Sequence, residues 1–374
     1  MQLISVCACF TMLILLYGTS RQYYVEIDGG EYRLQAPKSI TSAFLAVLVI
    51  TSTLRYGFID TYAYKEMYIL ARNNYDYIFT GAGWGIETGW LWLMYVLNYI
   101  SRSPKLMLFL SALLVCGAYV KVIRRYSEQV LFSLLLFFCL IYMDTNNGIR
   151  QMCASAILIL GFPALEKKKY LTNAICALAA YQLHNSAAVI AIVALTAIGR
   201  PLNIKTLGAL LLGIVFLFMP GEITGFLDTT LESNQYNYYL VMRGGMGIPR
   251  ALVTGIIPIG LSLLYIHKVK HRSIAVSYAE GMLINMTVIN GMFVMMGTYM
   301  QYWNRFAFYT FFAPIVMVPK MARIVFGDEN YFRAMKRIMI VLYLAYFAFN
   351  VFMNSGLPGA SSDALQQFYI EWWC

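Results

Sequence analysis

Residues 105–122 read KLMLFLSALLVCGAYVKV and residues 129–144 read QVLFSLLLFFCLIYMD, so two apolar runs follow each other closely. A membrane-spanning helix needs about 20 mostly apolar residues, and each run approaches that length when its polar flanks are included. Similar runs recur along the chain at 2–18, 39–54, 149–165, 170–184, 186–199, 206–220, 250–266, 277–298, 306–322 and 337–353. The sequence therefore predicts an all-α polytopic integral membrane protein with about 12 transmembrane helices.

The composition of the whole chain supports this prediction. Of its 374 residues, 60% are apolar and 12% are charged, and the mean hydropathy is +0.62. A soluble domain carries about 25% charged residues, and it could not cover so much apolar surface with so few polar groups. This excludes a soluble enzyme, a disordered protein and a nucleic-acid-binding domain. The net charge of +10 fits basic cytoplasmic loops and does not indicate nucleic acid.

Cysteines and targeting signals add little to the organisation of the chain. The seven Cys lie mostly within apolar runs and show no metal-ligand spacing, so we predict neither a disulfide framework nor a metal site. Residues 1–16 lack a basic n-region and a cleavage signal, which favours a retained first helix. No soluble domain separates from the rest, and we predict a single membrane domain over residues 1–374.

An aromatic stretch at 84–100, WGIETGWLWLMYVLNYI, decides the topology. Clusters of Lys and Arg lie between many of the predicted spans. If 84–100 spans, the protein has 13 helices, and the basic residues around Arg33 lie on the opposite side of the membrane from the other clusters. If 84–100 does not span, all these clusters lie on one side, as expected for cytoplasmic loops. We favour the second model, with both termini outside. In it, 84–100 is an interfacial or re-entrant helix within a long external loop, 55–104.

Polar residues gather where the predicted spans meet the outer surface, including the external loops 55–104 and 221–249. Any one of them has an ordinary explanation as a loop charge, a snorkelling anchor or a hydrogen-bonded histidine. Together they indicate function, because charges at a membrane edge are costly without partners. Arginines grip phosphates through paired hydrogen bonds, and a carboxylate can serve as a base. The residues of interest are Arg55, Asp60, Glu87, Arg150, His184, Arg243, Arg250 and Arg305.

The order and spacing of four motifs over roughly residues 45–200 resemble a known family. These motifs are Arg55-x-Gly-x-x-Asp60-x-Tyr62, Glu87-x-Gly89, Asn147-x-x-Arg150-Gln151 with Ala154, and His184-x-Ser186-Ala187. They resemble the EpsG-like family of Wzy-type polysaccharide polymerases. The chain departs from the family pattern at Leu183, where the family often has an aromatic residue directly ahead of the histidine.

The resemblance implies a polymerase of the bacterial inner (cytoplasmic) membrane that makes O-antigen of lipopolysaccharide, capsule or exopolysaccharide. Such enzymes transfer a growing glycan from undecaprenyl pyrophosphate to another lipid-linked repeat unit on the periplasmic face. It also implies a GT-C-like architecture and work without a metal or cofactor. The expected partners are the undecaprenyl-pyrophosphate-linked oligosaccharide, the lipid bilayer, a chain-length regulator and a flippase.

The resemblance also implies roles for the polar residues. Arg150 and Arg305 are the first choices for neutralising the pyrophosphate, with Arg55 as a further ligand and Arg243 or Arg250 as helpers from a mobile loop. For the base that takes the proton of the acceptor hydroxyl, Asp60 comes first, Glu87 second and His184 third.

Two alternatives remain open at this stage. A single-transfer GT-C glycosyltransferase or a polymer ligase would use the same arginines and acids, because the difference lies in the acceptor. A flippase of lipid-linked sugars is less well supported, since many transporters contain two similar halves and a site at the bilayer midplane. Here no matching halves are seen, and only Asn285 and Asn290 stand out in mid-membrane.

Overall fold

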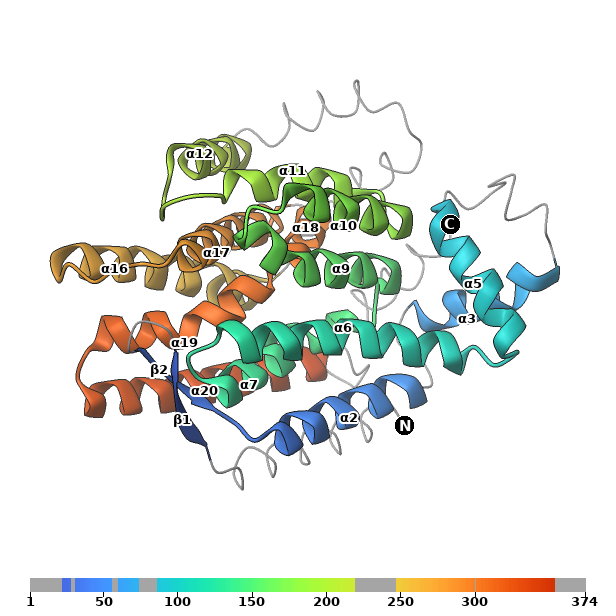
Figure 1. The fold of residues 1–374 in the computed structure, drawn as a ribbon, viewed down its shortest axis with the longest axis horizontal. Coiled ribbons are helices and arrows are strands. Elements are labelled where there is room, and N and C mark those ends of the chain that lie inside the picture. The colour runs from blue at the N-terminus through green and yellow to red at the C-terminus, as the bar shows by residue number, and fades with distance from the viewer. Residues whose placement is uncertain are drawn as a thin grey trace.

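The computed structural model describes residues 22–27, 31–55, 60–73, 86–218, 247–299 and 301–353. Nearly all of these residues form helices, many of which run along one axis of the molecule (Figure 1). The elements are β1 (Tyr23–Ile27), β2 (Glu31–Gln35), α2 (Lys38–Leu54), α3 (Thr61–Asn73), α5 (Thr88–Ile100), α6 (Lys105–Tyr126), α7 (Val130–Leu140), α8 (Tyr142–Thr145), α9 (Ile149–Glu166), α10 (Tyr170–Leu183), α11 (Ser186–Thr196), α12 (Ile204–Phe218), α15 (Ile248–Arg250), the π-helix η1 (Ala251–Ile256), α16 (Ile257–His271), α17 (Tyr278–Met296), α18 (Gln301–Thr310), α19 (Phe312–Phe326) and α20 (Glu329–Met353).

The apolar runs become helices wherever the structure describes them, from 39–54 through 337–353. Within these residues, five helices are long and apolar enough to cross a membrane, and the α18–α19 pair, bent by 64°, makes a sixth if it counts as one span. Shorter apolar helices are α2, α7, α11 and α12. The protein is thus an all-α, multi-pass membrane protein. The count of 12 helices stays a prediction, and the run 2–18 lies outside the described residues.

The connection between β2 and the end of α6 fixes which ends of the helices lie together. The Arg33 guanidinium donates to the Arg125 carbonyl, and the Arg124 guanidinium donates to the Ala36 carbonyl at 3.1 Å and to the Thr41 hydroxyl at 2.8 Å. The start of α2 therefore lies beside the end of α6. Because the two helices pack side by side, the segment 55–104 leaves and re-enters the bundle at the same end.

In the described part of that segment, the two short helices α3 and α5 pack on each other (Figure 1). The Asn98 amide donates to the Tyr68 carbonyl at 2.6 Å, and the Tyr68 hydroxyl donates to the Ser101 carbonyl at 2.7 Å. The helix α5 has 13 residues, which is about 20 Å of helix against a hydrocarbon core of about 30 Å. This geometry supports the model in which 84–100 does not span, although residues 84 and 85 lie outside the described ones.

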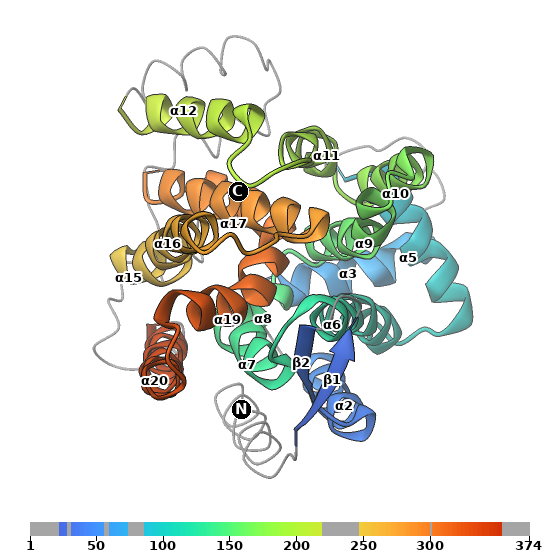
Figure 2. The ribbon, with the colours of Figure 1, turned by 60° about the vertical axis from the view of Figure 1, so that its left-hand side comes forward.

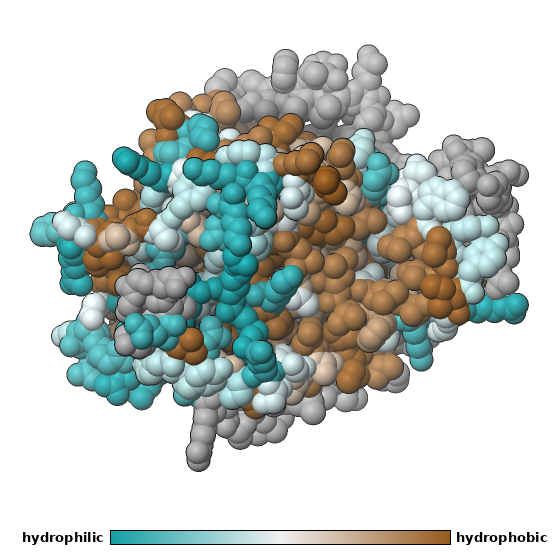
Figure 3. Space-filling model, viewed as in Figure 1, coloured by the Kyte–Doolittle hydropathy of each residue, from teal (hydrophilic) through white to brown (hydrophobic). Residues whose placement is uncertain are grey.

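Basic residues gather at the opposite end of the bundle. There Arg125 pairs with Glu166 at 3.2 Å, Arg323 with Glu128, and Lys320 with Glu280. Figure 3 shows a hydrophilic band over this end, around β1 and β2, with a broad hydrophobic surface between it and the end that carries α3 and α5. The predicted cytoplasmic loops thus share one end of the structure.

The hairpin of β1 and β2 is not among the sequence predictions. The two strands are antiparallel, with Tyr23 opposite Gln35, and Leu34 extends the contact by donating to the Glu128 carbonyl at 2.8 Å. The sequence signal for it is the Asp28-Gly29 dipeptide between two short stretches of alternating polarity.

The two asparagines of α17 bond to different neighbours, Asn285 to the connection between α11 and α12 and Asn290 to α18. Asn285 donates to the carbonyls of Ala197 and Arg200 and accepts from the Leu202 amide at 2.7 Å. Asn290 donates to the Ala307 carbonyl at 2.8 Å. Both side chains are fully buried, and their bonds give them the structural role common for polar residues between membrane helices.

We predict the sidedness of the membrane ends from this arrangement. In a cysteine-depleted protein, Ser39→Cys and Lys168→Cys should react with an impermeant maleimide only after the membrane is permeabilised, whereas Ser103→Cys should react in intact cells. All three positions are exposed in the structure. Labelling of Ser39→Cys and Ser103→Cys from the same side would instead show that the segment between them crosses the membrane an even number of times, as it would if 84–100 also spanned.

Candidate functional site

The turn between α8 and α9 connects three segments that are distant in sequence. The Gly148 amide donates to the Asp60 carboxylate at 2.7 Å, the Asn146 side-chain oxygen accepts from Arg55 at 2.9 Å, and the Asp144 carboxylate pairs with Arg250 at 2.8 Å. We call residues 144–148 the outer turn, because it lies at the end of the bundle opposite the basic end. It starts α9, which lies between α6 and α10 (Figure 2).

Backbone geometry at Gly148 makes this turn possible. Gly148 lies in the left-handed region with φ 55° and ψ 44° and precedes the first turn of α9. For residues with a Cβ this conformation is costly. With it, the Gly148 amide points at Asp60, while Arg150, two residues on, projects from the start of α9.

Arg55 holds the end of α2 against the outer turn. Besides Asn146, its guanidinium donates to the Ser52 carbonyl at 2.8 Å and to the Thr61 hydroxyl at 3.1 Å. Burial lowers the pKa of Arg55 to about 10, so it stays charged at neutral pH. Its hydrogen bonds in the structure go to neutral oxygens, and its positive charge therefore contributes to the field around Asp60.

A second group of residues joins α5, α9 and the turn between α10 and α11. One oxygen of the Glu87 carboxylate forms an ion pair with Arg150, and the other accepts a hydrogen bond from the backbone amide of Asn185 at 2.9 Å. Arg150 also donates to the Tyr64 hydroxyl at 3.5 Å. The Glu87 side chain is 6% exposed and that of Arg150 is 21% exposed, so Arg150 is the member of the pair that reaches solvent.

Asp60 lies in the field of three arginines. Burial raises the pKa of its carboxyl group, whereas the Gly148 amide and the charges of Arg305, Arg150 and Arg55 act in the opposite direction. Arg305 belongs to α18. This helix is linked to α9 because the side-chain amide of Gln151 donates to the Arg305 backbone carbonyl at 2.7 Å. Three guanidinium groups thus face two carboxylates, those of Asp60 and Glu87. Among the described residues of the cluster, the guanidinium groups outnumber the carboxylates, which makes it a suitable place for an anion.

His184 is neutral in this cluster. Burial, together with the charges of Arg150 and Arg305, lowers the pKa of the imidazole to about 3. Its Nδ1 lies 3.7 Å from the Glu87 carboxylate, but a neutral imidazole makes no ion pair there. The Ser186 amide donates to the same Nδ1 at 3.3 Å, and the Ser186 hydroxyl lies 2.8 Å from that of Tyr309.

The structure therefore brings together most of the residues singled out in the sequence. Five of them lie together where α2 and α10 end and α5 and α9 begin: Arg55, Asp60, Glu87, Arg150 and His184. The charge of Arg305 acts on both Asp60 and His184. We call these six residues the charged cluster. Arg250 is different, because it is buried, paired with Asp144, and stacked over Phe308 with 5.8 Å to the ring centroid. Arg243 and residues 221–246 of its loop lie outside the described residues.

Sequence reasoning missed Tyr309 as a neighbour of the cluster. It lies in the apolar run 306–322 and is 2% exposed. The signal for it is chemical, because a tyrosine within a buried run needs a partner for its hydroxyl. That partner is Ser186.

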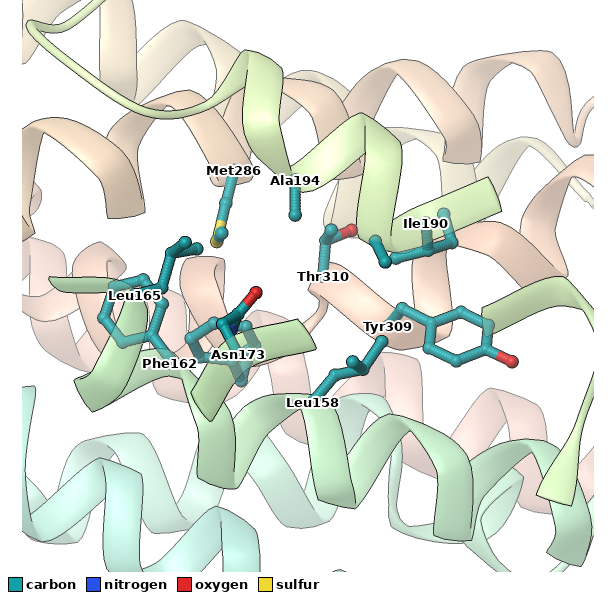
Figure 4. Close-up of a pocket in the computed structure, with 11 residues that line it drawn as sticks. Leu158, Phe162, Leu165, Asn173, Ile190, Ala194, Met286, Tyr309 and Thr310 are labelled. Atoms are coloured by element: carbon teal, nitrogen blue, oxygen red, sulfur yellow. The ribbon is translucent and has the colours of Figure 1, made fainter. Parts of the chain in front are cut away.

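A pocket lies deeper in the bundle, next to this cluster. Figure 4 shows it between α9, α10, α11 and α17, with the Tyr309 side chain at one side. Its lining is mainly apolar and comprises Leu158, Phe162, Leu165, Asn173, Ile190, Ala191, Ala194, Met286, Tyr309, Thr310 and Phe312. Tyr309 therefore contributes its ring to the pocket while its hydroxyl bonds to Ser186 in the charged cluster.

Comparisons with known proteins give one match. The model of the EpsG family matches residues 39–366, which includes every described residue of the charged cluster. Neither the curated proteins nor the solved structures give a significant match.

We predict that Gly148→Ala destabilises the protein by about 1 kcal/mol, because the left-handed conformation is unfavourable for alanine. The added Cβ meets no atom within 4 Å, so the loss of stability would come from backbone strain and not from a steric clash. Gly148→Asn should cost less, since asparagine tolerates this region better. The matched control is Gly117→Ala inside α6, where there is equal space and no positive φ. Equal thermal stability of the two alanine variants in detergent would contradict the argument.

We predict that His184 does not titrate in the folded protein between pH 8 and pH 5. In a single-histidine variant, His267→Gln with His271→Gln, the imidazole ¹⁵N shifts should stay constant over this range, because the lowered pKa keeps the ring neutral until the pH approaches 3. In the denatured protein the same ring should titrate near pH 6.5. A folded-state midpoint close to the denatured one would show that the burial and the arginine charges do not act on the ring as described.

Proposed function

The chain belongs to the EpsG family, a family of polysaccharide polymerase-like membrane proteins, and from this premise we propose that it is a polysaccharide polymerase of the bacterial inner membrane. It transfers a growing glycan from undecaprenyl pyrophosphate to a second lipid-linked repeat unit. The reaction takes place on the periplasmic face, where the charged cluster lies. The products are of the O-antigen, capsule or exopolysaccharide class.

The partly exposed Arg150 is the observation that carries this proposal. Its Nη1 bonds to Glu87 and its Nε to Tyr64, and within the described part of the chain its Nη2 makes no hydrogen bond. One edge of the guanidinium is therefore left for an anionic oxygen, next to the charge of Arg305. A pyrophosphate placed here would be attracted by the arginines of the cluster, and its departure as a leaving group would be stabilised by the same arginines.

Asp60 is the first candidate for the base. The acceptor hydroxyl oxygen forms a bond to the anomeric carbon, the bond from that carbon to the pyrophosphate oxygen breaks, and the hydroxyl proton passes to the carboxylate. One Asp60 oxygen bonds to Gly148, while the other makes no hydrogen bond within the described residues. Burial raises the pKa of this carboxyl, which makes it a stronger base. Both Glu87 oxygens are engaged, so Glu87 ranks second.

The apolar pocket and the surface helices complete the proposed architecture. The pocket shares Tyr309 with the environment of His184 (Figure 4), which suits a substrate that joins a charged head group to a hydrocarbon chain. The helices α3 and α5 lie in an early external segment that contributes Glu87 and Tyr64 to the cluster. We propose that this arrangement is GT-C-like, with a chain-length regulator and a flippase as partners in the membrane.

The test is polymerisation of purified lipid-linked repeat units in proteoliposomes. The wild-type protein should give a ladder of products. Arg150→Ala should lower the rate at least about 100-fold, in the range seen when a group that stabilises the transition state is removed. Asp60→Asn should lower it by about 10²–10⁴-fold, because the amide cannot accept the proton.

The control is Arg333→Ala, which removes an exposed arginine at the basic end and should leave the ladder unchanged. Insertion and thermal stability of each variant are measured alongside. A single added unit from the wild-type protein would favour a ligase or single-transfer enzyme, and lipid movement without transfer would favour a flippase. A full ladder from Asp60→Asn would move the role of base to another residue.

A further inference from the structure

The Nδ1 atom of His184 is surrounded by groups that determine where the imidazole proton resides. The Ser186 backbone amide lies 3.3 Å from Nδ1 and the Ser186 hydroxyl lies 3.1 Å from it. A backbone amide can only donate, so Nδ1 must present a lone pair to it. A neutral imidazole has one proton on its nitrogens, and that proton is therefore on Nε2.

The hydroxyl groups continue this assignment. With Nδ1 as the acceptor, the Ser186 hydroxyl donates to it, and the Tyr309 hydroxyl, 2.8 Å from the Ser186 oxygen, donates to Ser186. Ser186 and Tyr309 are 8% and 2% exposed, respectively. The chain runs from Tyr309 through Ser186 to His184, and the Ser186 hydroxyl has one acceptor role and one donor role that its two neighbours satisfy.

The Glu87 carboxylate does not compete for this proton. The distance of 3.7 Å from its oxygen to Nδ1 is too long for a hydrogen bond, and its oxygens accept from Arg150 and from the Asn185 backbone amide instead. A proton on Nδ1 would face the hydrogen of the Ser186 backbone amide, which cannot accept it. A base role for His184 requires that proton, since a lone pair on Nε2 of a neutral ring places the hydrogen on Nδ1.

We propose that Ser186 and Tyr309 are positioning residues that hold His184 as the Nε2–H tautomer, so that His184 donates a hydrogen bond to a phosphoryl oxygen of the lipid pyrophosphate. This inference rests on the proposed function for the identity of the acceptor. Within the described residues Nε2 makes no hydrogen bond, and the side chain is 22% exposed. Arg150 and Arg305 lie near enough for their charges to act on the ring, so an anion that they bind is within the neighbourhood of Nε2.

A neutral donor has a physical advantage at this position. Two arginines already supply the positive charge, and a further cation would add repulsion in a poorly solvated site. The Nε2–H group adds a directed hydrogen bond without adding charge. His184 thereby helps to orient the leaving group, and the role of base is left to a carboxylate.

The tautomer can be measured without substrate. In the single-histidine variant, His267→Gln with His271→Gln, long-range ¹H–¹⁵N correlation at pH 7 should show a protonated Nε2 and an unprotonated Nδ1. Ser186→Ala should raise the share of the Nδ1–H form about fivefold, as expected for the loss of one net hydrogen bond, whereas Ser186→Thr should keep the wild-type pattern. Tyr309→Phe should have a smaller effect in the same direction. A protonated Nδ1 in the parent protein would overturn the inference.

Activity separates a donor from a base. His184→Gln keeps an N–H donor and should retain polymerisation within about tenfold of wild type, whereas His184→Ala should lose clearly more, since an unmade hydrogen bond to a charged group costs more than a weakened one. Equal and complete loss in both variants would contradict the donor role. If the parent protein shows the Nε2–H tautomer but polymerises no substrate, the proposed function fails and the tautomer assignment stands.

Discussion

The bonding of the outer turn to segments far away in the sequence, through two hydrogen bonds and one ion pair, is the constraint on which the site depends. Charged groups at the edge of a membrane are costly unless they find partners. The outer turn supplies such partners through the Gly148 amide, the Asn146 side chain and the Asp144 carboxylate. These bonds hold Asp60, Arg55 and Arg250 near the start of α9. In the first turn of the same helix, Arg150 forms an ion pair with Glu87. The apolar helices set the frame, and the polar bonds at their ends determine the site.

The distribution of charge explains why one arginine is the strongest candidate for the substrate. Arg250 is buried and paired with Asp144. Arg55 donates its hydrogen bonds to neutral oxygens, and these bonds hold α2 to the outer turn. Of Arg55, Arg150 and Arg250, only Arg150 combines an ion pair that orients it with a partly exposed side chain. Its partner Glu87 is fixed by the Asn185 amide, so the arginine is preorganised rather than free to follow its counter-ion. Preorganised charge of this kind is what stabilises a departing anion most effectively.

Sequence patterns predicted the helices better than the contacts between them. The apolar runs predict α6, α9 and α17 because spanning helices need long apolar segments whatever their neighbours are. The polar clusters predicted that residues such as Arg55, Asp60 and Arg150 would share one face, since that follows from the order of the spans. The pairing of Glu87 with Arg150, across 63 residues, could not be derived, because it depends on how α5 packs against α10, which in turn packs against α9. The bend at Phe311 and the role of Tyr309 depend on packing in the same way.

The central proposal is that a lipid pyrophosphate binds at the charged cluster beside α9 with its chain towards the apolar pocket. The most direct measurement is an electron cryo-microscopy map of the protein in nanodiscs with undecaprenyl pyrophosphate. We expect density for the two phosphates against Arg150 and Arg305, with the chain leaving along the side of Tyr309. Density for the phosphates at the opposite, basic end of the bundle, with the charged cluster unchanged, would contradict it.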